Sequence, residues 1–314
     1  MPVTETSSTQ TPTPWAAGAA YIDGRFMPIA EAAIPITDWG YRRSDVTYDV
    51  VGVRDGAFFR LDDHVRRFRA SMETFRLKPP EDDAAIKRVL HRCVALAGLR
   101  DAYVAMDCLR GRPPAGQPYH PAFARNYLAA FALPWISLVR PDVMERGAHL
   151  VVAETLRIPT RSVDPRAKNF HWADLTRGQF EARDRGADFC VLLDEDGHVT
   201  EGPGFNLFVV AEGRLATPDA GVLEGLTRQS VIELADELGM PVAVRKVGVA
   251  ELRDADEILL VTTAGGIMPA SRIDGRIMGN DRPGPVFRRL HDAFWGKRAG
   301  GWHATPVDYA AGEA

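Results

Sequence analysis

Short apolar runs alternate with amphipathic stretches along this chain, and this alternation is what most limits its fold. The run 46–53, Val-Thr-Tyr-Asp-Val-Val-Gly-Val, is β-branched and aromatic, which predicts a strand. From about Asp63, the spacing of Phe68, Met72 and Phe75 places apolar side chains on one face of a helix. The two patterns recur, predicting further strands at 102–109, 127–133, 149–153, 188–193, 204–210 and 258–263 and further helices at 82–97, 172–183, 227–238 and 285–295. We therefore predict an α+β fold.

Two local signals add detail to this prediction. Asp23-Gly24 lies between apolar residues and predicts a hairpin turn. Thr227 is suited to the N-cap of the helix at 227–238, and Gly239 follows its end.

The length of 314 residues favours two domains over a single core. The stretch 134–146 contains two prolines and no clear period, so we place the boundary there. The predicted division is a flexible, Thr/Ser/Pro-rich arm at 1–17, a small N-terminal domain at 18–133, a linker at 134–146 and a larger C-terminal domain at 147–314.

Composition excludes several classes of protein. The formal net charge of -4 gives no sign of a nucleic-acid or membrane partner. Three widely spaced cysteines support neither a disulfide framework nor a zinc site, and we expect no bound metal. No segment resembles a signal peptide or a membrane span, so we expect a cytoplasmic protein.

Lysine is scarce in this chain, which makes the isolated Lys168 notable. Only five of the 38 basic residues are lysines, and Lys168 lies among small and apolar residues in Asp-Pro-Arg-Ala-Lys-Asn-Phe-His-Trp. Arginine stays protonated, whereas a lysine amine can lose its proton and attack a carbonyl group. A surface lysine that caps a helix is the alternative explanation, and this stretch alone favours that alternative.

Three features could bind a phosphate group. Arg67 lies in the first turns of its predicted helix and could hold phosphate with its planar guanidinium, although most helix-face arginines are simply solvated. Gly225-Leu226-Thr227-Arg228 begins a helix with free backbone N–H groups. The segment 262–266, Thr-Thr-Ala-Gly-Gly, ends a strand with hydroxyl groups, and a plain turn explains it equally well.

Glu201 is the fourth candidate. It lies in Thr-Glu-Gly-Pro-Gly-Phe-Asn, directly before a predicted buried strand. It could be an ordinary turn residue, or an anion that keeps a pyridine nitrogen protonated.

Taken together, these segments resemble the fold-type IV pyridoxal-phosphate transaminases. The resemblance rests on Lys168-Asn169 and on the segments 201–207, 221–228 and 263–269, in order and spacing, and it covers about Ala20 to Tyr309. The segments 44–51, 58–64 and 168–172 are most similar to the (R)-selective amine transaminases. The resemblance implies a small α/β domain followed by a larger domain with a β-barrel-like core.

The resemblance also implies roles for the residues found above. Lys168 would hold pyridoxal 5'-phosphate as a Schiff base and later transfer a proton. Glu201 would hold the pyridine nitrogen protonated, which keeps the ring an electron sink. Arg67, the amides of Leu226 and Thr227, and the pair Thr262-Thr263 would hold the phosphate. An amino group would pass from an (R)-amine or D-amino acid to a keto acid such as pyruvate, through pyridoxamine phosphate.

The substrate pocket implied by the resemblance contains Tyr48, Val50, Tyr103, Trp172 and Ala264, with the loop after Arg110 arching over it. The resemblance further implies a homodimer with the site at the subunit interface.

Three positions depart from the amine-transaminase pattern. Arg43 replaces a histidine, Ala105 replaces a glutamate, and the loop at 112–117 lacks an arginine at the usual point. We expect Arg43 or Arg112 to bind the substrate carboxylate. A surface charge at Arg43 is the alternative.

Several related activities remain as alternatives: a D-amino-acid or branched-chain aminotransferase, or a fold-type IV lyase similar to aminodeoxychorismate lyase. The branched-chain enzymes usually carry a tyrosine where this chain has Ala173. A non-catalytic relative that binds a small molecule is disfavoured because Lys168, Glu201 and Arg67 are all present.

Overall fold

A tight hairpin opens the first of two β-sheets. The computed structural model describes residues 14–312, and in it β1 (Ala19–Ile22) pairs antiparallel with β2 (Arg25–Pro28). Asp23 and Gly24 between them have φ of 47° and 87°, the positive values that a two-residue hairpin turn requires. The predicted hairpin is confirmed.

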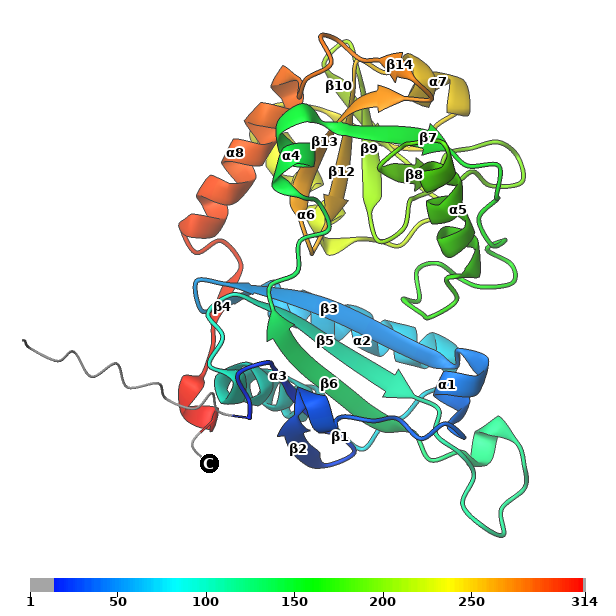
Figure 1. Ribbon diagram of the computed structural model, residues 1–314, viewed down its shortest axis with the longest axis vertical. Coiled ribbons are helices and arrows are strands. Elements are labelled where there is room, and N and C mark those ends of the chain that lie inside the picture. The colour runs from blue at the N-terminus through cyan, green and yellow to red at the C-terminus, as the bar shows by residue number, and fades with distance from the viewer. Residues whose placement is uncertain (1–13, 313–314) are drawn as a thin grey trace, which may run out of the picture.

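The first sheet has seven strands, and the end of the chain supplies one of them. Across the sheet the order is β15 (Ala304–Pro306), β4 (Ala57–Phe59), β3 (Val46–Arg54), β5 (Ala102–Leu109), β6 (Tyr127–Pro134), β1 and β2. β15 pairs antiparallel with β4, so the C-terminal segment runs back to the first sheet (Figure 1). This pairing differs from the predicted division, which places all of 147–314 together. It covers the outer edge of β4, which would otherwise expose unpaired backbone groups.

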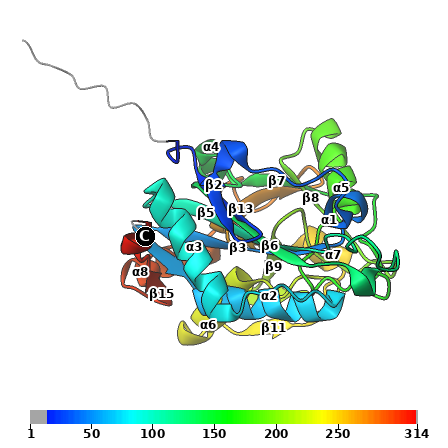
Figure 2. The ribbon, with the colours of Figure 1, turned by 90° about the horizontal axis from the view of Figure 1, so that it is seen from below.

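Two helices cover one face of this sheet: α2 (Leu61–Phe75) and α3 (Asp83–Ala97) (Figure 2). Asp82 caps α3 by accepting a 2.7 Å hydrogen bond from the Ala85 amide, and Gly98 ends it with φ of 64°. The apolar faces of both helices meet inward-facing strand residues in one core, which includes Phe58, Phe68, Met72, Leu90, Val104 and Met106. The apolar spacing predicted from Phe68 and Met72 is therefore that of the face of α2 that is buried.

The second sheet is buried on both faces. Its order is β11 (Val242–Val244), β10 (Arg214–Thr217), β9 (Asn206–Ala211), β12 (Glu257–Thr262), β13 (Gly266–Ile273), β7 (Ala148–Val152) and β8 (Phe189–Val191), with β14 (Arg276–Ile277) paired to β13. Alternate residues of β12 enter different cores, Ile258 and Leu260 one and Leu259 and Val261 the other. This two-sided burial explains why 258–261 reads as a continuous apolar run.

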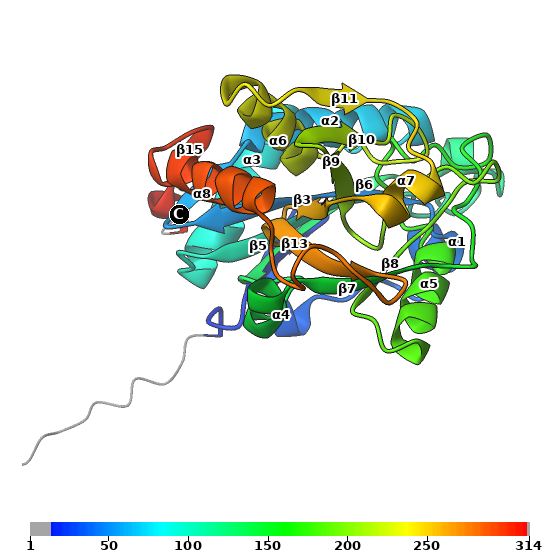
Figure 3. The same cartoon turned by 90° about the horizontal axis from the view of Figure 1, so that it is seen from above.

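Helices on the two faces complete those cores. α6 (Leu226–Glu237) and α8 (Pro285–Ala299), adjacent in Figure 3, pack together against β12. The other core takes Val143 of α4 (Pro141–Arg146) and Leu252 of α7 (Val249–Asp254). α5 (Ala173–Asp184) lies against β8, and the short α1 (Trp39–Arg43) precedes β3. Mixed helices and two sheets confirm the predicted α+β class.

Three local predictions need correction. The predicted linker contains α4, which is too short for a helical period to show in the sequence. The strand β13 follows the predicted glycine turn and was not predicted. Gly225, not Thr227, is the N-cap of α6. A Cβ at Gly225 would collide with Asn206 Oδ1, so this close approach admits only glycine.

The ends of the chain bear on two further predictions. Residues 1–13 of the predicted arm lie outside the described residues, while Trp15 packs against the first core. Between residues 14 and 312, no helix combines the length and apolarity that a membrane crossing needs.

Arg60 joins three segments that are distant in sequence. It precedes α2 in a left-handed conformation, with φ of 56°. Its side chain is only 2% exposed and forms ion pairs with Asp63 of α2, at 3.0 Å, and with Glu233 of α6. It also donates to Nε2 of His303, at 2.9 Å, beside β15. Arg60 thus connects the first sheet to a helix of the second.

We predict that Arg60→Ala lowers the free energy of unfolding by about 3 kcal/mol, because it leaves carboxylates without their buried cation. Denaturant titration followed by circular dichroism measures the change. Arg66→Ala is the matched control, since Arg66 also pairs with Asp63 but is 74% exposed, and should cost less than about 0.5 kcal/mol. Equal losses of unfolding free energy in the two variants would show that burial of Arg60 does not strengthen its ion pairs.

Asp107 is an unpaired carboxylate on the other face of the first sheet. On β5 it lies opposite Tyr48 of β3 and Ala129 of β6. Its neighbours Met106 and Cys108 point into the core under the helices, so Asp107 faces away from that core. Among residues 14–312 its carboxylate has no hydrogen bond or ion pair. Burial raises the pKa of Asp107 to about 7.

We predict that ionised Asp107 destabilises the fold as the pH rises. A carboxyl whose pKa is higher in the folded than in the unfolded state stabilises the fold at low pH, and this contribution disappears as the pH rises through about 7. The melting temperature of Asp107→Asn, relative to that of the natural chain, should therefore increase as the pH rises from 5 to 8. Asp101→Asn, at an exposed site just before β5, should show no such trend. A difference independent of pH for Asp107→Asn would contradict the prediction.

Candidate functional site

One cavity of about 440 Å³ is lined by residues from both sheets and the segments between them. It brings together twelve of the fourteen predicted site residues: Tyr48, Val50, Arg67, Tyr103, Lys168, Trp172, Glu201, Leu226, Thr227, Thr262, Thr263 and Ala264. They come from strands, helix starts and loops spread over more than 200 positions of sequence. The remaining two, Arg43 and Arg112, are elsewhere.

Lys168 is held in this cavity through its backbone. The Tyr48 amide of β3 donates to the Lys168 carbonyl at 3.1 Å, and the Lys168 amide donates to Ser71 Oγ of α2 at 3.0 Å. The side chain remains free to act: Nζ lies 4.3 Å from the centre of the Tyr48 ring. No ion pair joins it to a carboxylate within the described part of the chain. The amine is therefore available for reaction.

Arg67 is oriented by a buried carboxylate. Its Nε and Nη2 donate to the two oxygens of Asp49, each at 2.8 Å. His64 lies 2.8 Å from the same Asp49 through Nδ1. Burial alone would raise the pKa of Asp49, but Arg67 and then His64 hold it well below its usual range. Burial lowers the pKa of His64, with Asp49 opposing, so the imidazole is neutral near pH 7.

The third arm of Arg67 reaches the start of α6. Nη1 donates to the Glu224 carbonyl at 3.2 Å, just before the N-cap Gly225. Within residues 14–312, no side chain caps the first amides of α6, those of Leu226 and Thr227 among them. Thr262 and Thr263 line the same cavity from the end of β12. A guanidinium, unpaired helix N–H groups and hydroxyl groups together are suited to a phosphate.

Glu201 lies in the cavity and is buried. Its Oε2 accepts hydrogen bonds from the Leu223 amide at 2.9 Å and from Asn206 Nδ2 at 3.3 Å. Its Oε1 accepts from Arg157. Burial raises the pKa of Glu201, although Arg157 and the Leu223 amide oppose this shift.

Arg157 is the clearest site residue that sequence reasoning missed. It lines the cavity and forms ion pairs with Glu201 at 3.1 Å and Asp174 at 2.6 Å. Nothing in Leu-Arg-Ile-Pro-Thr marks it out from the many other arginines. The predicted linker also contributes, since Ile136 and Leu138 line the cavity.

Arg43 and Arg112 occupy a separate cavity of about 290 Å³, with Thr37, Trp39, Arg42 and Tyr119. The Arg43 guanidinium lies 3.8 Å from the Trp39 ring centre. One helical turn separates these two residues, so they share a face of α1. The loop after Arg110 supplies no lining residue to the Lys168 cavity among the described residues, in contrast to the expectation that it arches over the pocket.

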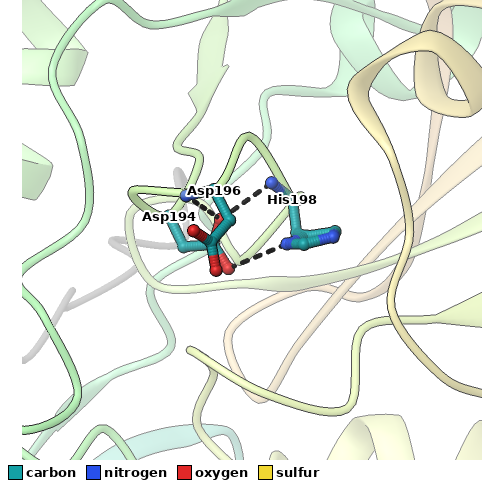
Figure 4. A group of neighbouring side chains, drawn as sticks. All are labelled: Asp194, Asp196 and His198. Carbon is teal, nitrogen blue, oxygen red and sulfur yellow. Dashed lines mark hydrogen bonds and ion pairs between the residues drawn. The ribbon is translucent and has the colours of Figure 1, made fainter.

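A group of Asp194, Asp196 and His198 has the ligand types of a cation site (Figure 4). Asp194 Oδ1 accepts from the backbone amides of Asp196, at 3.0 Å, and His198, at 2.8 Å. These bonds are the ordinary hydrogen bonds of an Asp-initiated turn. The turn explains the grouping without a metal.

Chemically, the cavity fits pyridoxal 5'-phosphate. The Arg67 and α6 donors match a phosphate, Lys168 offers an amine for an aldehyde, and Glu201 offers an anion for a protonated ring nitrogen. All three kinds of group line one cavity.

Comparison with known proteins agrees with this chemistry. The model of the amino-transferase class IV family matches residues 47–273. A putative branched-chain-amino-acid aminotransferase of Methanocaldococcus jannaschii is 28% identical, over 87% of this chain and 94% of that protein. The D-alanine aminotransferase of Bacillus licheniformis is 26% identical over the same shares.

A similar solved structure is that of the branched-chain amino acid aminotransferase from Thermobaculum terrenum in its pyridoxal-phosphate form. It is 27% identical, with a TM-score of 0.83 over 93% of this chain and 99% of that one. Pyridoxal phosphate is the cofactor of class IV aminotransferases. The chain belongs to the class IV aminotransferase family.

Proposed function

We propose that this protein is a pyridoxal-phosphate-dependent transaminase that moves an amino group from an (R)-amine or D-amino acid to a keto acid such as pyruvate. The observation that carries the proposal is the single cavity in which Lys168, Glu201 and the Arg67–α6 cluster meet. The segments 44–51, 58–64 and 168–172 support the amine-transaminase type.

The twelve predicted site residues that line the cavity each have a role in this proposal. When bound, pyridoxal phosphate supplies an aldehyde for the amino group and a ring that accepts electron density. Lys168 Nζ would take a proton from Cα of the substrate and deliver it to C4′ of the cofactor. Glu201 keeps the ring nitrogen protonated. Arg67, the Leu226 and Thr227 amides and the Thr262 and Thr263 hydroxyls hold the phosphate, while Tyr48, Val50, Tyr103, Trp172 and Ala264 form the wall that the substrate contacts.

A D-amino-acid or branched-chain aminotransferase is the second candidate. The similarity to enzymes with both names favours it. Ala173, in place of the tyrosine usual in branched-chain enzymes, favours the first candidate. A lyase of the same fold type is the third candidate.

We predict that the purified protein with pyridoxal phosphate absorbs near the edge of the visible range and that Lys168→Ala abolishes this band. Lys246→Ala, at an exposed lysine, is the control and should keep it. Single enantiomers of 1-phenylethylamine and alanine are then added to the natural enzyme. Bleaching by (R)-1-phenylethylamine supports the amine-transaminase type. Bleaching by D-alanine alone would favour the second candidate, and no bleaching by any amine would overturn transamination.

A substrate carboxylate needs a cation of its own. Of the arginines that line the cavity, Arg67 is paired with Asp49 and Arg157 with Glu201. Arg43 and Arg112 form no ion pair within the described residues, and they remain our candidates, although each must turn out of its separate cavity to reach a substrate.

We predict that Arg43→Ala or Arg112→Ala slows the pyruvate half-reaction about tenfold, the effect of a lost charge-assisted hydrogen bond. The half-reaction with 1-phenylethylamine should be unaffected, and stopped-flow absorbance separates the two. If both variants react with pyruvate at the natural rate, neither arginine binds the carboxylate.

The proposed enzyme is a homodimer. A second, largely apolar cavity of about 450 Å³ shares Tyr48 and Trp172 with the first, and the exposed Tyr41 is part of its lining. An apolar surface beside the site supports an interface there. Sedimentation equilibrium of the natural chain and of Tyr41→Asp tests this, since a dimer closed over this surface should dissociate more readily in the variant.

A further inference from the structure

The carboxylate of Glu201 is buried, so its negative charge needs compensation. A buried anion is strongly disfavoured unless cations or hydrogen-bond donors compensate it. Here donors approach both oxygens: Leu223 and Asn206 on Oε2, and Arg157 on Oε1. Among the residues that the structure describes, Arg157 is the one charged donor, and it contacts Oε1 through Nε at 3.3 Å and Nη2 at 3.1 Å.

Arg157 is shared with a second buried carboxylate. Its Nη1 donates to Asp174 Oδ2 at 2.6 Å, closer than either contact with Glu201. Side-chain exposure is 10% for Arg157, 7% for Asp174 and 9% for Glu201, so solvent screens the three groups little.

Asp174 is itself fixed by backbone donors. The Ile158 amide donates to Oδ2 at 2.8 Å, and the Leu175 amide donates to Oδ1 at 2.8 Å. Asp174 lies in the first turn of α5, where the helix dipole favours an anion. It therefore holds one arm of Arg157 without competition from water.

Two carboxylates and one guanidinium leave this group with one uncompensated negative charge. We propose that Arg157 is a positioning residue that fixes Glu201 in the cavity, and that Asp174, by taking one arm of Arg157, leaves the group a net charge of -1 that a protonated pyridine nitrogen neutralises. This inference rests on the proposed function, in which Glu201 faces the ring nitrogen.

Burial is the largest influence on the ionisation of Glu201. Burial raises the pKa of Glu201 even though Arg157 and Lys168 are both close enough to lower it. If Arg157 paired with Glu201 alone, it would neutralise the Glu201 charge and weaken the attraction of Glu201 for a second cation. Division of Arg157 between two acids keeps Glu201 able to attract the ring proton.

The first test concerns the apoprotein and needs no activity. Arg157→Met leaves Glu201 without its cation, so the folded-state pKa of Glu201 rises further above its unfolded value. Stability of the variant should then fall more steeply than that of the natural apoprotein as the pH rises from 5 to 8. Adding Glu201→Gln should remove the share of this extra pH dependence that belongs to Glu201, and the remainder belongs to Asp174, which also loses Arg157. Arg157→Lys should restore part of the loss. Arg161→Met, at an arginine whose side chain is 79% exposed, is the matched control.

The second test separates the ring nitrogen from the rest of the cofactor. In Asp174→Asn, we expect Arg157 to form an ion pair with Glu201 alone. The group of Arg157, Glu201 and residue 174 then has no net charge. The preference of the apoprotein for pyridoxal phosphate over its analogue with carbon in place of the ring nitrogen should fall on the order of tenfold, the effect of a partner that acts through a ligand-binding residue. Arg161→Met should keep the natural preference. Both affinities are measured by fluorescence titration.

The outcomes distinguish this inference from the proposed function. If the pH profile of apo Arg157→Met matches the natural one, or if Asp174→Asn weakens both cofactors equally, the charge arrangement is wrong even where pyridoxal phosphate binds normally. If the natural protein binds no pyridoxal phosphate, or Lys168→Ala keeps the visible band, the proposed function fails instead.

Discussion

The bidentate pair between Arg67 and Asp49 is the interaction on which the site depends. This pair joins α2 to β3. Nη1 of Arg67 donates to the Glu224 carbonyl just before α6, so residues of three elements meet at one guanidinium. Because Asp49 is fully buried and also contacts His64, Arg67 is held in a single orientation. A fixed cation beside unpaired helix amides is prepared for an anion before any ligand arrives.

The same rule of compensated burial governs Glu201, which lines the same cavity. Glu201 is stabilised by Arg157 and by backbone and amide donors, and Arg157 by Asp174. Lys168 differs from these groups, because its backbone is fixed by Tyr48 and Ser71 while its amine has no acidic partner among the described residues. The side chains of Arg67 and Glu201 are thus fixed by their partners, whereas the amine that we propose to react has no such constraint.

Local structure was largely predictable because it depends on short-range patterns. The hairpin at Asp23-Gly24, the helix ended by Gly98 and the apolar run of β12 all follow from backbone preference and periodicity. The N-cap of α6 was not, because Gly225 is required by the nearby Asn206 side chain and not by its own neighbours in sequence. The strand β15 was missed for a similar reason, since its pairing partner is more than 240 residues away.

For the site, the sequence by itself determined which chemistry is available: one isolated lysine, an acid before a buried strand, a helix-start glycine and hydroxyl groups at a strand end. Their resemblance to a known family added the expectation that they converge. Only the tertiary structure decided how charges are shared among them. Arg157, one arginine among many in the sequence, becomes a cavity residue because α5 and Glu201 approach it from both sides. Arg43 lies apart because the single turn of α1 stacks it on Trp39. Electrostatic partnership depends on distance in space, which short-range sequence patterns do not encode.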